Sequence, residues 1–120
     1  MRGSKADIPM FSQFEGTLNW QIEWGGMNVS IETDRPGYNQ SSAGHEDAAY
    51  LCQCPHWGYV IKGKLWVRYK DYEEVIQAGD VYYLAPGHQA ALQEAGEVVE
   101  FSPANEYQKT LEITLQNKYS

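Results

Sequence analysis

The sequence predicts an all-β fold of antiparallel strands that form a sandwich or a closed barrel. Turn-forming residues recur at short intervals, as at Pro36-Gly37 and Gly79-Asp80, and runs of strand length lie between them. The chain is also rich in aromatic residues, with nine Tyr, four Trp and three Phe, which suit the half-buried surface of a sheet. Many short strands at regular spacing are typical of sandwiches and barrels.

A series of strands is expected where apolar and polar residues alternate between turn residues. Residues 62–64 are interpreted as the turn of one hairpin and residues 70–72 as the turn of another. Ser102 and Pro103 favour one helical turn with Ser102 as its cap, and nothing in the sequence predicts a long helix. The expected strands are Trp20–Trp24, Met27–Thr33, Tyr59–Ile61, Leu65–Tyr69, Glu74–Gln77, Val81–Leu84, Val98–Phe101 and Leu111–Leu115.

Length and charge limit the organisation of the chain and its partners. With 120 residues the chain suits one domain, and we expect residues 1–15 to form an N-terminal arm and residues 16–120 a single domain. The formal net charge of −7 argues against nucleic acid or an anionic membrane surface as a partner. No apolar run approaches the roughly 18 residues that a membrane-spanning helix needs. We therefore expect neither nucleic-acid nor membrane partners.

The two cysteines, Cys52 and Cys54, are separated by one residue. In an extended strand their Cα atoms would lie about 7 Å apart, so a disulfide between them would be strained. Free or metal-bound thiols indicate a reducing compartment, and this predicts a cytoplasmic protein. The alternative interpretation is two small buried cysteines without chemistry.

Two segments resemble the paired motifs of the cupin superfamily. The first is His-Trp-Gly-Tyr-Val-Ile-Lys-Gly-Lys-Leu at residues 56–65, whose second half is similar to the hairpin that follows the cupin metal ligands. The second is Gly-Asp-Val-Tyr-Tyr-Leu-Ala-Pro-Gly-His at residues 79–88. The combination resembles a group of small single-domain bacterial cupins of uncharacterised function. This resemblance implies an antiparallel double-stranded β-helix, the jelly-roll barrel, with a working site inside it.

The positions that bind metal in cupins carry different residues in this chain. The usual cupin ligands are two His and one Glu in the first motif and one His in the second. Counting back from Gly63, His56 stands in place of the Glu and Cys52 in place of the second His. Tyr50 stands in place of the first His, and Ala90 in place of the His of the second motif. The usual ligand set is therefore absent, and a ring of different ligand types remains near the same positions.

Three of the remaining side chains are predicted to hold a metal. If no bulge intervenes, alternation along a strand places four residues on one face, namely Tyr50, Cys52, Cys54 and His56. His88 is expected to approach this face from the facing strand. We predict Cys52, His56 and His88 as ligands of one transition metal ion, because thiolate and imidazole suit Zn, Fe, Cu or Ni better than Mg or Ca. The alternatives are a hydrogen-bonded core histidine at His56 and a turn residue at His88.

Other residues near the motifs are candidates for contact with a small organic molecule. They are Tyr50, Cys54, Trp57 and Tyr59. Trp57 and Tyr59 can equally be packing residues, since aromatic side chains dominate β-sheet cores. Glu100 can face the barrel as an acid–base group, although a solvated strand carboxylate is the favoured interpretation.

Two kinds of function follow from these residues. The first is a metal-dependent enzyme of dioxygenase, isomerase or lyase type that acts on a small organic molecule in the barrel. The second is a metal-free cupin that binds or senses a small ligand without catalysis. In either case we expect a homodimer, because the apolar strand Trp20–Trp24 would otherwise leave an uncovered sheet edge.

Overall fold

The computed structural model describes residues 1–11, 17–34 and 51–119, and their side chains except those of residues 111 and 113–119. The described part of the chain contains seven strands and one helix. They are β1 (Met10–Phe11), β2 (Thr17–Trp24), β3 (Met27–Asp34), β4 (His56–Arg68), β5 (Glu73–Gln77), β6 (Val81–Leu84), β7 (Gln89–Pro103) and α2 (Ala104–Tyr119). Within these described ranges, no helix has the length and apolar content needed to cross a membrane.

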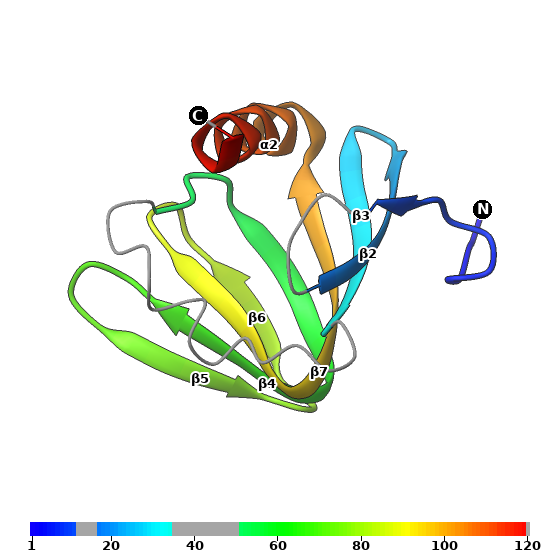
Figure 1. Ribbon diagram of the computed structural model, residues 1–120. Helices are drawn as coiled ribbons and strands as arrows, with labels where there is room; N and C mark the ends of the chain where they lie inside the picture. The colour runs from blue at the N-terminus through cyan, green and yellow to red at the C-terminus, as the bar shows by residue number, and fades with distance from the viewer. Residues whose placement is uncertain (12–16, 35–50, 120) are drawn as a thin grey trace.

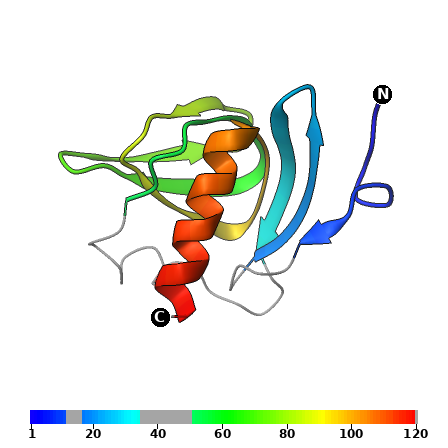
Figure 2. The ribbon, with the colours of Figure 1, turned by 90° about the horizontal axis from the view of Figure 1, so that it is seen from above.

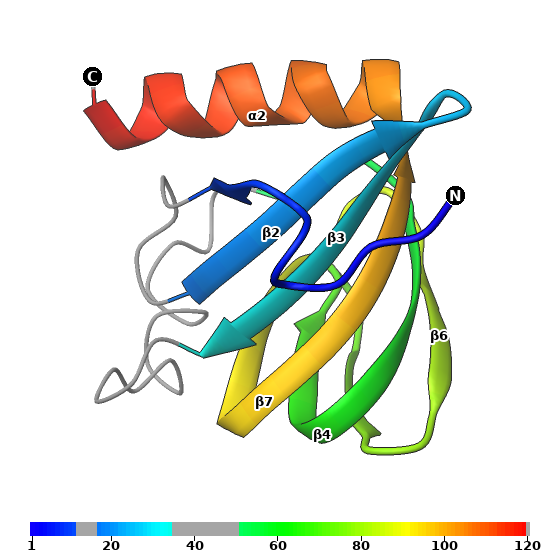
Figure 3. The same cartoon turned by 90° about the vertical axis from the view of Figure 1, so that its right-hand side faces the viewer.

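The strands form one curved sheet in the order β1-β2-β3-β7-β4-β5, and β6 pairs with β4 as well. Every pair is antiparallel. The long strand β7 lies at the centre, because its C-terminal part pairs with β3 on one side while β4 pairs with it on the other. The sheet curls round as a barrel, and α2 lies across one end of it (Figure 1; Figure 3). The all-β antiparallel prediction is confirmed.

The predicted hairpin at residues 62–64 is wrong, because β4 continues through these residues without turning back. Gly63 marks an irregularity instead, since the pairing of β4 with β7 shifts register between Val60 and Lys62 and again between Lys62 and Lys64. Gly63 has φ +72°, and a Cβ placed on it would lie 2.5 Å from the Cα of Gly96 on β7. Glycine is therefore required here by a close approach of two backbones at the bend of the barrel, and not by a chain reversal.

The C-terminal prediction is also wrong, because α2 runs for 16 residues where one turn and a strand over Leu111–Leu115 were expected. Five residues that alternate between apolar and polar are too few to separate a strand from one face of a helix. The Leu, Glu, Gln and Lys residues of this segment have high helix propensity, and they favour the helix that forms. Ser102 belongs to β7, and its hydroxyl contacts His56. Seen from above, α2 runs over the opening between the β2–β3 side and the β4–β6 side (Figure 2).

The strand that was predicted to form an uncovered edge of the sheet is partly covered. Trp20–Trp24 was expected to be an uncovered edge, but β1 pairs with β2 through Met10 opposite Trp20 and Phe11 opposite Asn19. Part of the N-terminal arm therefore covers part of this strand. The predicted homodimer stays a prediction.

The inner face of the barrel is divided into an apolar and a polar part. The apolar part is a buried cluster contributed by β4 to β7, comprising Val60, Leu65, Val67, Ile76, Tyr82, Leu84, Leu92 and Val98. On β2 and β3 the buried side chains include Asn19, Asn28 and Ser30. Buried polar groups cost free energy unless they are hydrogen-bonded, so a polar inner wall in a small barrel indicates a site and not a core.

Candidate functional site

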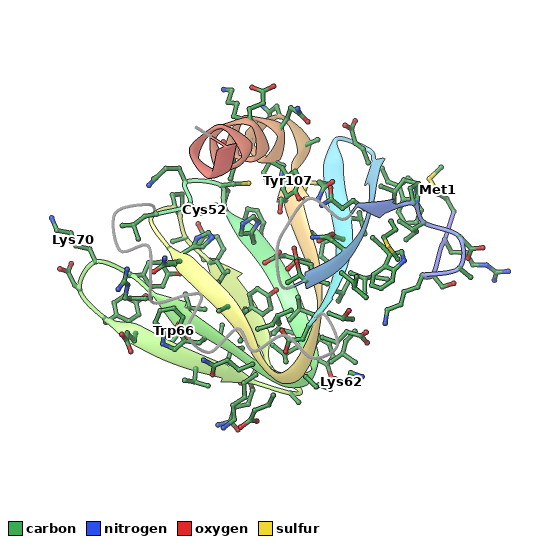
Figure 4. All side chains as sticks on the ribbon, viewed as in Figure 1. Met1, Cys52, Lys62, Trp66, Lys70 and Tyr107 are labelled. Carbon is green, nitrogen blue, oxygen red and sulfur yellow. The ribbon has the colours of Figure 1, made fainter. Side chains whose placement is uncertain are left out.

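The ligand atoms of Cys52, His56 and His88 all lie within 4.8 Å of one another. Cys52 Sγ is 3.8 Å from His56 Nε2, and the two imidazole rings meet edge to face with their centroids 5.0 Å apart. Both histidines are buried and Cys52 is partly buried. Cys52 lies on the barrel side of α2, as does Tyr107 of that helix (Figure 4). The structure thus brings together the three residues that the sequence predicts as metal ligands.

Backbone pairing brings Cys52 and His88 together. The Cys52 N–H donates to the carbonyl of His88, while the Cys52 carbonyl accepts from the N–H groups of Gly87 and His88. Gly87 has φ +97°, a conformation that glycine adopts easily, and it lets the Pro86-Gly87 turn present His88 to Cys52. His88 therefore reaches the site from the loop before β7, and His56 from the first residue of β4.

Hydrogen bonds orient both imidazoles for ligation. The Nδ1 atom of His88 lies 2.7 Å from the Ala85 carbonyl. A carbonyl only accepts, so Nδ1 carries the proton and the lone pair of a neutral ring lies on Nε2. His56 Nδ1 lies 2.6 Å from the Ser102 hydroxyl, and its Nε2 faces the Cys52 sulfur. A ligand histidine is usually held in this way, with its second nitrogen bonded to a neighbouring polar group.

Burial sets the protonation of the three groups before any metal binds. Desolvation lowers the pKa of His56 to about 4 and the pKa of His88 to about 4, so both rings are neutral at pH 7. Desolvation raises the pKa of the Cys52 thiol, against the lowering effect of a hydrogen bond with the Cys54 backbone. A metal ion would therefore find two imidazoles ready to bind and would displace one proton, from sulfur.

The donor set fits a borderline or soft transition metal. In a tetrahedral zinc site the ligand atoms lie about 3.3–3.6 Å apart, given metal–ligand bonds of about 2.0–2.3 Å. The distance of 3.8 Å between Cys52 Sγ and His56 Nε2 is close to that spacing. The three ligand atoms lie up to 4.8 Å apart, so the most distant pair would have to approach by about 1 Å to bind one metal ion. Three protein ligands leave a fourth position open for water or a substrate, as catalytic zinc sites do.

The three residues line a cavity of about 260 Å³ inside the barrel. One part of its wall is apolar and includes Leu65, Leu84 and Leu92, and another part carries the side chains of Glu32 and Glu100. A mostly apolar cavity with a few fixed polar groups is the usual form of a small-molecule site.

The prediction that Glu100 is a solvated strand carboxylate is wrong, and Glu32 was not predicted at all. Glu100 accepts a hydrogen bond from the Tyr82 hydroxyl at 3.1 Å, and Glu32 accepts one from Asn19 Nδ2 at 2.7 Å. Burial raises the pKa of Glu32, the neighbouring Glu100 raises it further, and the Asn19 bond opposes both effects. Burial also raises the pKa of Glu100, against the effect of its bond from Tyr82.

A signal for this wall was present in the sequence. Asn28, Ser30 and Glu32 alternate with Val29 and Ile31 along β3, and this pattern is that of a strand with one polar face. The polar face would ordinarily be assigned to solvent. The register of β3 with β7 decides otherwise, since it places Ser30 opposite Glu100 on the inner face of the barrel.

Three of the remaining predicted site residues, Cys54, Trp57 and Tyr59, do not join this cluster. The alternation fails at Cys54, where the chain bends before Pro55, and the Cys54 thiol donates to the Pro55 carbonyl at 3.5 Å. Both cysteines are free thiols, as expected. Trp57 and Tyr59 are 44% and 41% exposed, so they lie on the outer face of β4 and not in the cavity. Tyr50 lies outside the described residues.

The carboxyl pair predicts an unusual pH dependence for the metal-free protein. A carboxyl whose folded pKa is raised stabilises the fold at low pH, and this stabilisation is lost as pH rises through the folded values of about 7 for Glu100 and about 8 for Glu32. The histidines act in the opposite sense, but only between about pH 4 and pH 6.5.

We therefore expect the free energy of unfolding to fall by about 1–3 kcal/mol between about pH 6.5 and pH 8. Urea denaturation in the presence of a chelator measures this fall. The E32Q/E100Q variant should show almost none of it. A wild-type free energy that is flat or rises over this interval would contradict the raised pKa values of Glu32 and Glu100.

No family model and no curated protein matches this sequence. Solved structures do match. An RmlC-like cupin from Shewanella frigidimarina superposes with a TM-score of 0.62 at 17% identity, over 87% of this chain and 91% of that one. KdgF from Halomonas sp. gives 0.55 at 14% identity, over 83% of this chain and 92% of that one. Hydroxypropylphosphonic acid epoxidase from S. wedmorenis gives 0.61 at 8% identity, over 85% of this chain and 58% of that one.

The chain has the cupin fold. The resemblance of residues 56–65 and 79–88 to the cupin motifs is thereby confirmed at the level of fold, because β4 and β6 carry these motifs and pair with each other. Within this cupin barrel, Ala90 occupies the position of the usual second-motif histidine and lines the cavity. Among the described residues, the side chains close enough together to hold a metal ion are those of Cys52, His56 and His88.

Proposed function

We propose that this cupin is a small metal-dependent enzyme that acts on a small organic molecule within the barrel. The observation that carries the proposal is the position of Cys52, His56 and His88 in the wall of a cavity that also holds two carboxyl groups. A bound transition metal would supply a Lewis acid at this wall. Similar solved structures include an iron(II) form of HppE, with a TM-score of 0.60 at 7% identity.

The residues of the chain have distinct tasks in this proposal. Cys52, His56 and His88 would hold the metal, and the Ser102 hydroxyl and the Ala85 carbonyl would fix the orientation of the two imidazoles. Glu100 and Glu32 have raised pKa values close to neutral pH, so either carboxyl can hold or release a proton beside a bound substrate. Dioxygenase, isomerase and lyase types of reaction all fit these tasks.

One observation favours the second candidate, a metal-free cupin that binds or senses a small molecule. Cupins with the usual site have a histidine where this chain has Ala90, and Ala90 contributes no ligand to the cavity that it lines. In that case Cys52 and the two histidines would act as polar contacts for the ligand.

Titration with cobalt(II) separates the two candidates. For the metal site we expect one cobalt ion per chain, with the absorption of tetrahedral cobalt and a sulfur-to-metal charge-transfer band. The Cys52→Ser variant should lose the charge-transfer band, while the matched Cys54→Ser variant should keep it. Absence of stoichiometric binding by the wild-type protein would exclude the metal-dependent function and leave the metal-free one.

A further inference from the structure

The polar wall of the cavity presents hydrogen-bond acceptors without a cation to match them. Neither Glu32 nor Glu100 forms an ion pair in the described part of the chain, and no Lys or Arg is among the described residues that line the cavity. Glu32 and Glu100 are partly buried, and a carboxylate withdrawn from water without a cation is costly, so the pair keeps protons or accepts a positive group from outside the chain.

Asn19 supports Glu32 and is not itself among the residues that line the cavity. It is fully buried, and its Oδ1 has no hydrogen-bond partner although its Nδ2 donates to Glu32. Asn19 of β2 is directly opposite Glu32 of β3, so both side chains lie on the inner face of the sheet. The Asn19 Oδ1 atom has almost no accessible surface, so the role of Asn19 is to hold the Glu32 carboxyl in position.

The sheet register brings the two carboxyl groups together. Ser30 is the direct partner of Glu100, and Glu32 lies two residues further along β3 on the same face, which makes Glu32 and Glu100 diagonal neighbours. Side chains as long as Glu reach each other at this spacing. The two carboxyls are also held in place, since Glu32 Oε1 bonds to Asn19 and Glu100 Oε1 bonds to Tyr82.

Gly58 leaves space for the ring of Tyr82, whose hydroxyl donates the hydrogen bond to Glu100. A Cβ at Gly58 would lie 2.4 Å from Cζ of Tyr82, so the Tyr82 ring occupies the space that a side chain would take. This close approach of the ring to β4 lets the Tyr82 hydroxyl reach Glu100 across the strand. The acceptor wall is thus fixed by packing before any ligand arrives, which lowers the cost of binding.

We propose that the cavity takes a small primary amine, with its ammonium group bound by Glu32 and Glu100 and its carbon chain on the apolar part of the wall. This inference deepens the proposed function by naming the chemical class of its substrate. An ammonium group offers N–H donors and a positive charge, and so matches a pair of carboxyl groups with no cation beside them in the described lining of the cavity. The cavity of about 260 Å³ admits a molecule of a few carbon atoms. Carboxylate and phosphate ligands would meet two carboxyl groups and are disfavoured.

Three probes of similar shape test the proposal: n-butylamine, n-butanol and butyrate. Calorimetry on the chelator-treated, metal-free protein at pH 7 removes any direct bond between amine and metal. We expect butylamine to bind at least about tenfold more tightly than butanol, because hydrogen bonds to charged groups are the stronger ones. Butyrate should bind most weakly.

Matched variants assign the preference to the proposed wall. The E32Q/E100Q variant keeps the shape of the side chains and should bind butylamine and butanol equally, whereas Glu94→Gln, on the exposed part of β7, should behave as the wild type. The thermal unfolding transition checks that each variant is folded. Equal binding of amine and alcohol by the wild type, no binding of amine at about 10 mM, or a preference that survives E32Q/E100Q would each overturn the proposal.

The amine-binding experiment and the cobalt titration can succeed or fail independently of each other. Cobalt binding without an amine preference would overturn the amine and leave the metal-dependent function. An amine preference without cobalt binding would support the proposed amine ligand and would favour the second candidate function, a metal-free cupin that binds this ligand.

Discussion

Replacing His56 with alanine is expected to abolish stoichiometric cobalt binding and to leave the barrel folded. His56 supplies the ligand atom next to the Cys52 sulfur, at 3.8 Å, and its removal leaves two ligands of three. The loss should exceed the roughly 10- to 100-fold fall in affinity that follows when only the hydrogen-bond partner of a ligand is removed. Competition titration against a chelating dye measures both effects.

Two variants calibrate the His56→Ala result. Ser102→Ala removes the hydroxyl 2.6 Å from His56 Nδ1 and should weaken binding by about 10- to 100-fold without abolishing it. Trp57→Phe changes the next residue along β4, whose side chain is 44% exposed on the outer face, and should leave affinity unchanged. Full cobalt stoichiometry in His56→Ala would make His56 a structural residue and would remove the metal site.

The largest effect on stability is expected for Gly63→Ala. The new Cβ would lie 2.5 Å from Gly96 Cα and 2.7 Å from the Gln93 carbonyl oxygen, and both are backbone atoms that cannot rotate away. The positive φ of +72° adds conformational strain for any residue with a side chain. We expect a loss of about 3 kcal/mol or more in the free energy of unfolding, measured by urea denaturation.

Gly79→Ala is the matched control. Gly79 also has a positive φ, of +96°, but no atom lies within 4 Å of the Cβ that it would carry. Its cost should be the conformational term alone, about 1–2 kcal/mol. Equal losses in the two variants would show that β4 and β7 do not approach each other closely at Gly63.

The cluster of Cys52, His56 and His88 could be predicted from the sequence because its signal is local. Cys52, His56 and His88 lie within or beside two motifs whose geometry is carried by short-range strand and turn preferences. Cys54 marks the limit of that reasoning, since strict alternation assumed an extended strand. Pro55 has no N–H to donate to a sheet ladder, so the chain bends there and β4 starts only at His56.

The carboxyl wall could not be predicted because it depends on contacts between distant parts of the chain. Glu32 and Glu100 are separated by most of the domain in sequence, and each taken alone is an ordinary strand carboxylate. Their shared position follows from the register of β3 on β7. The long helix was missed for the opposite reason, since the five-residue pattern of Leu111–Leu115 fits both a strand and a helix.

The backbone bonds between Cys52 and His88 also bear on how a metal would enter. These two residues are joined by N–H···O bonds to one another, so their side chains are neighbours in the folded chain before any ion arrives. A zinc finger, in contrast, folds only as it captures its ion. An ion at this site would be loaded into a finished protein and could be exchanged without unfolding it. The identity of that ion would then be decided by which metals the cell supplies, because affinity alone follows the same order at most sites.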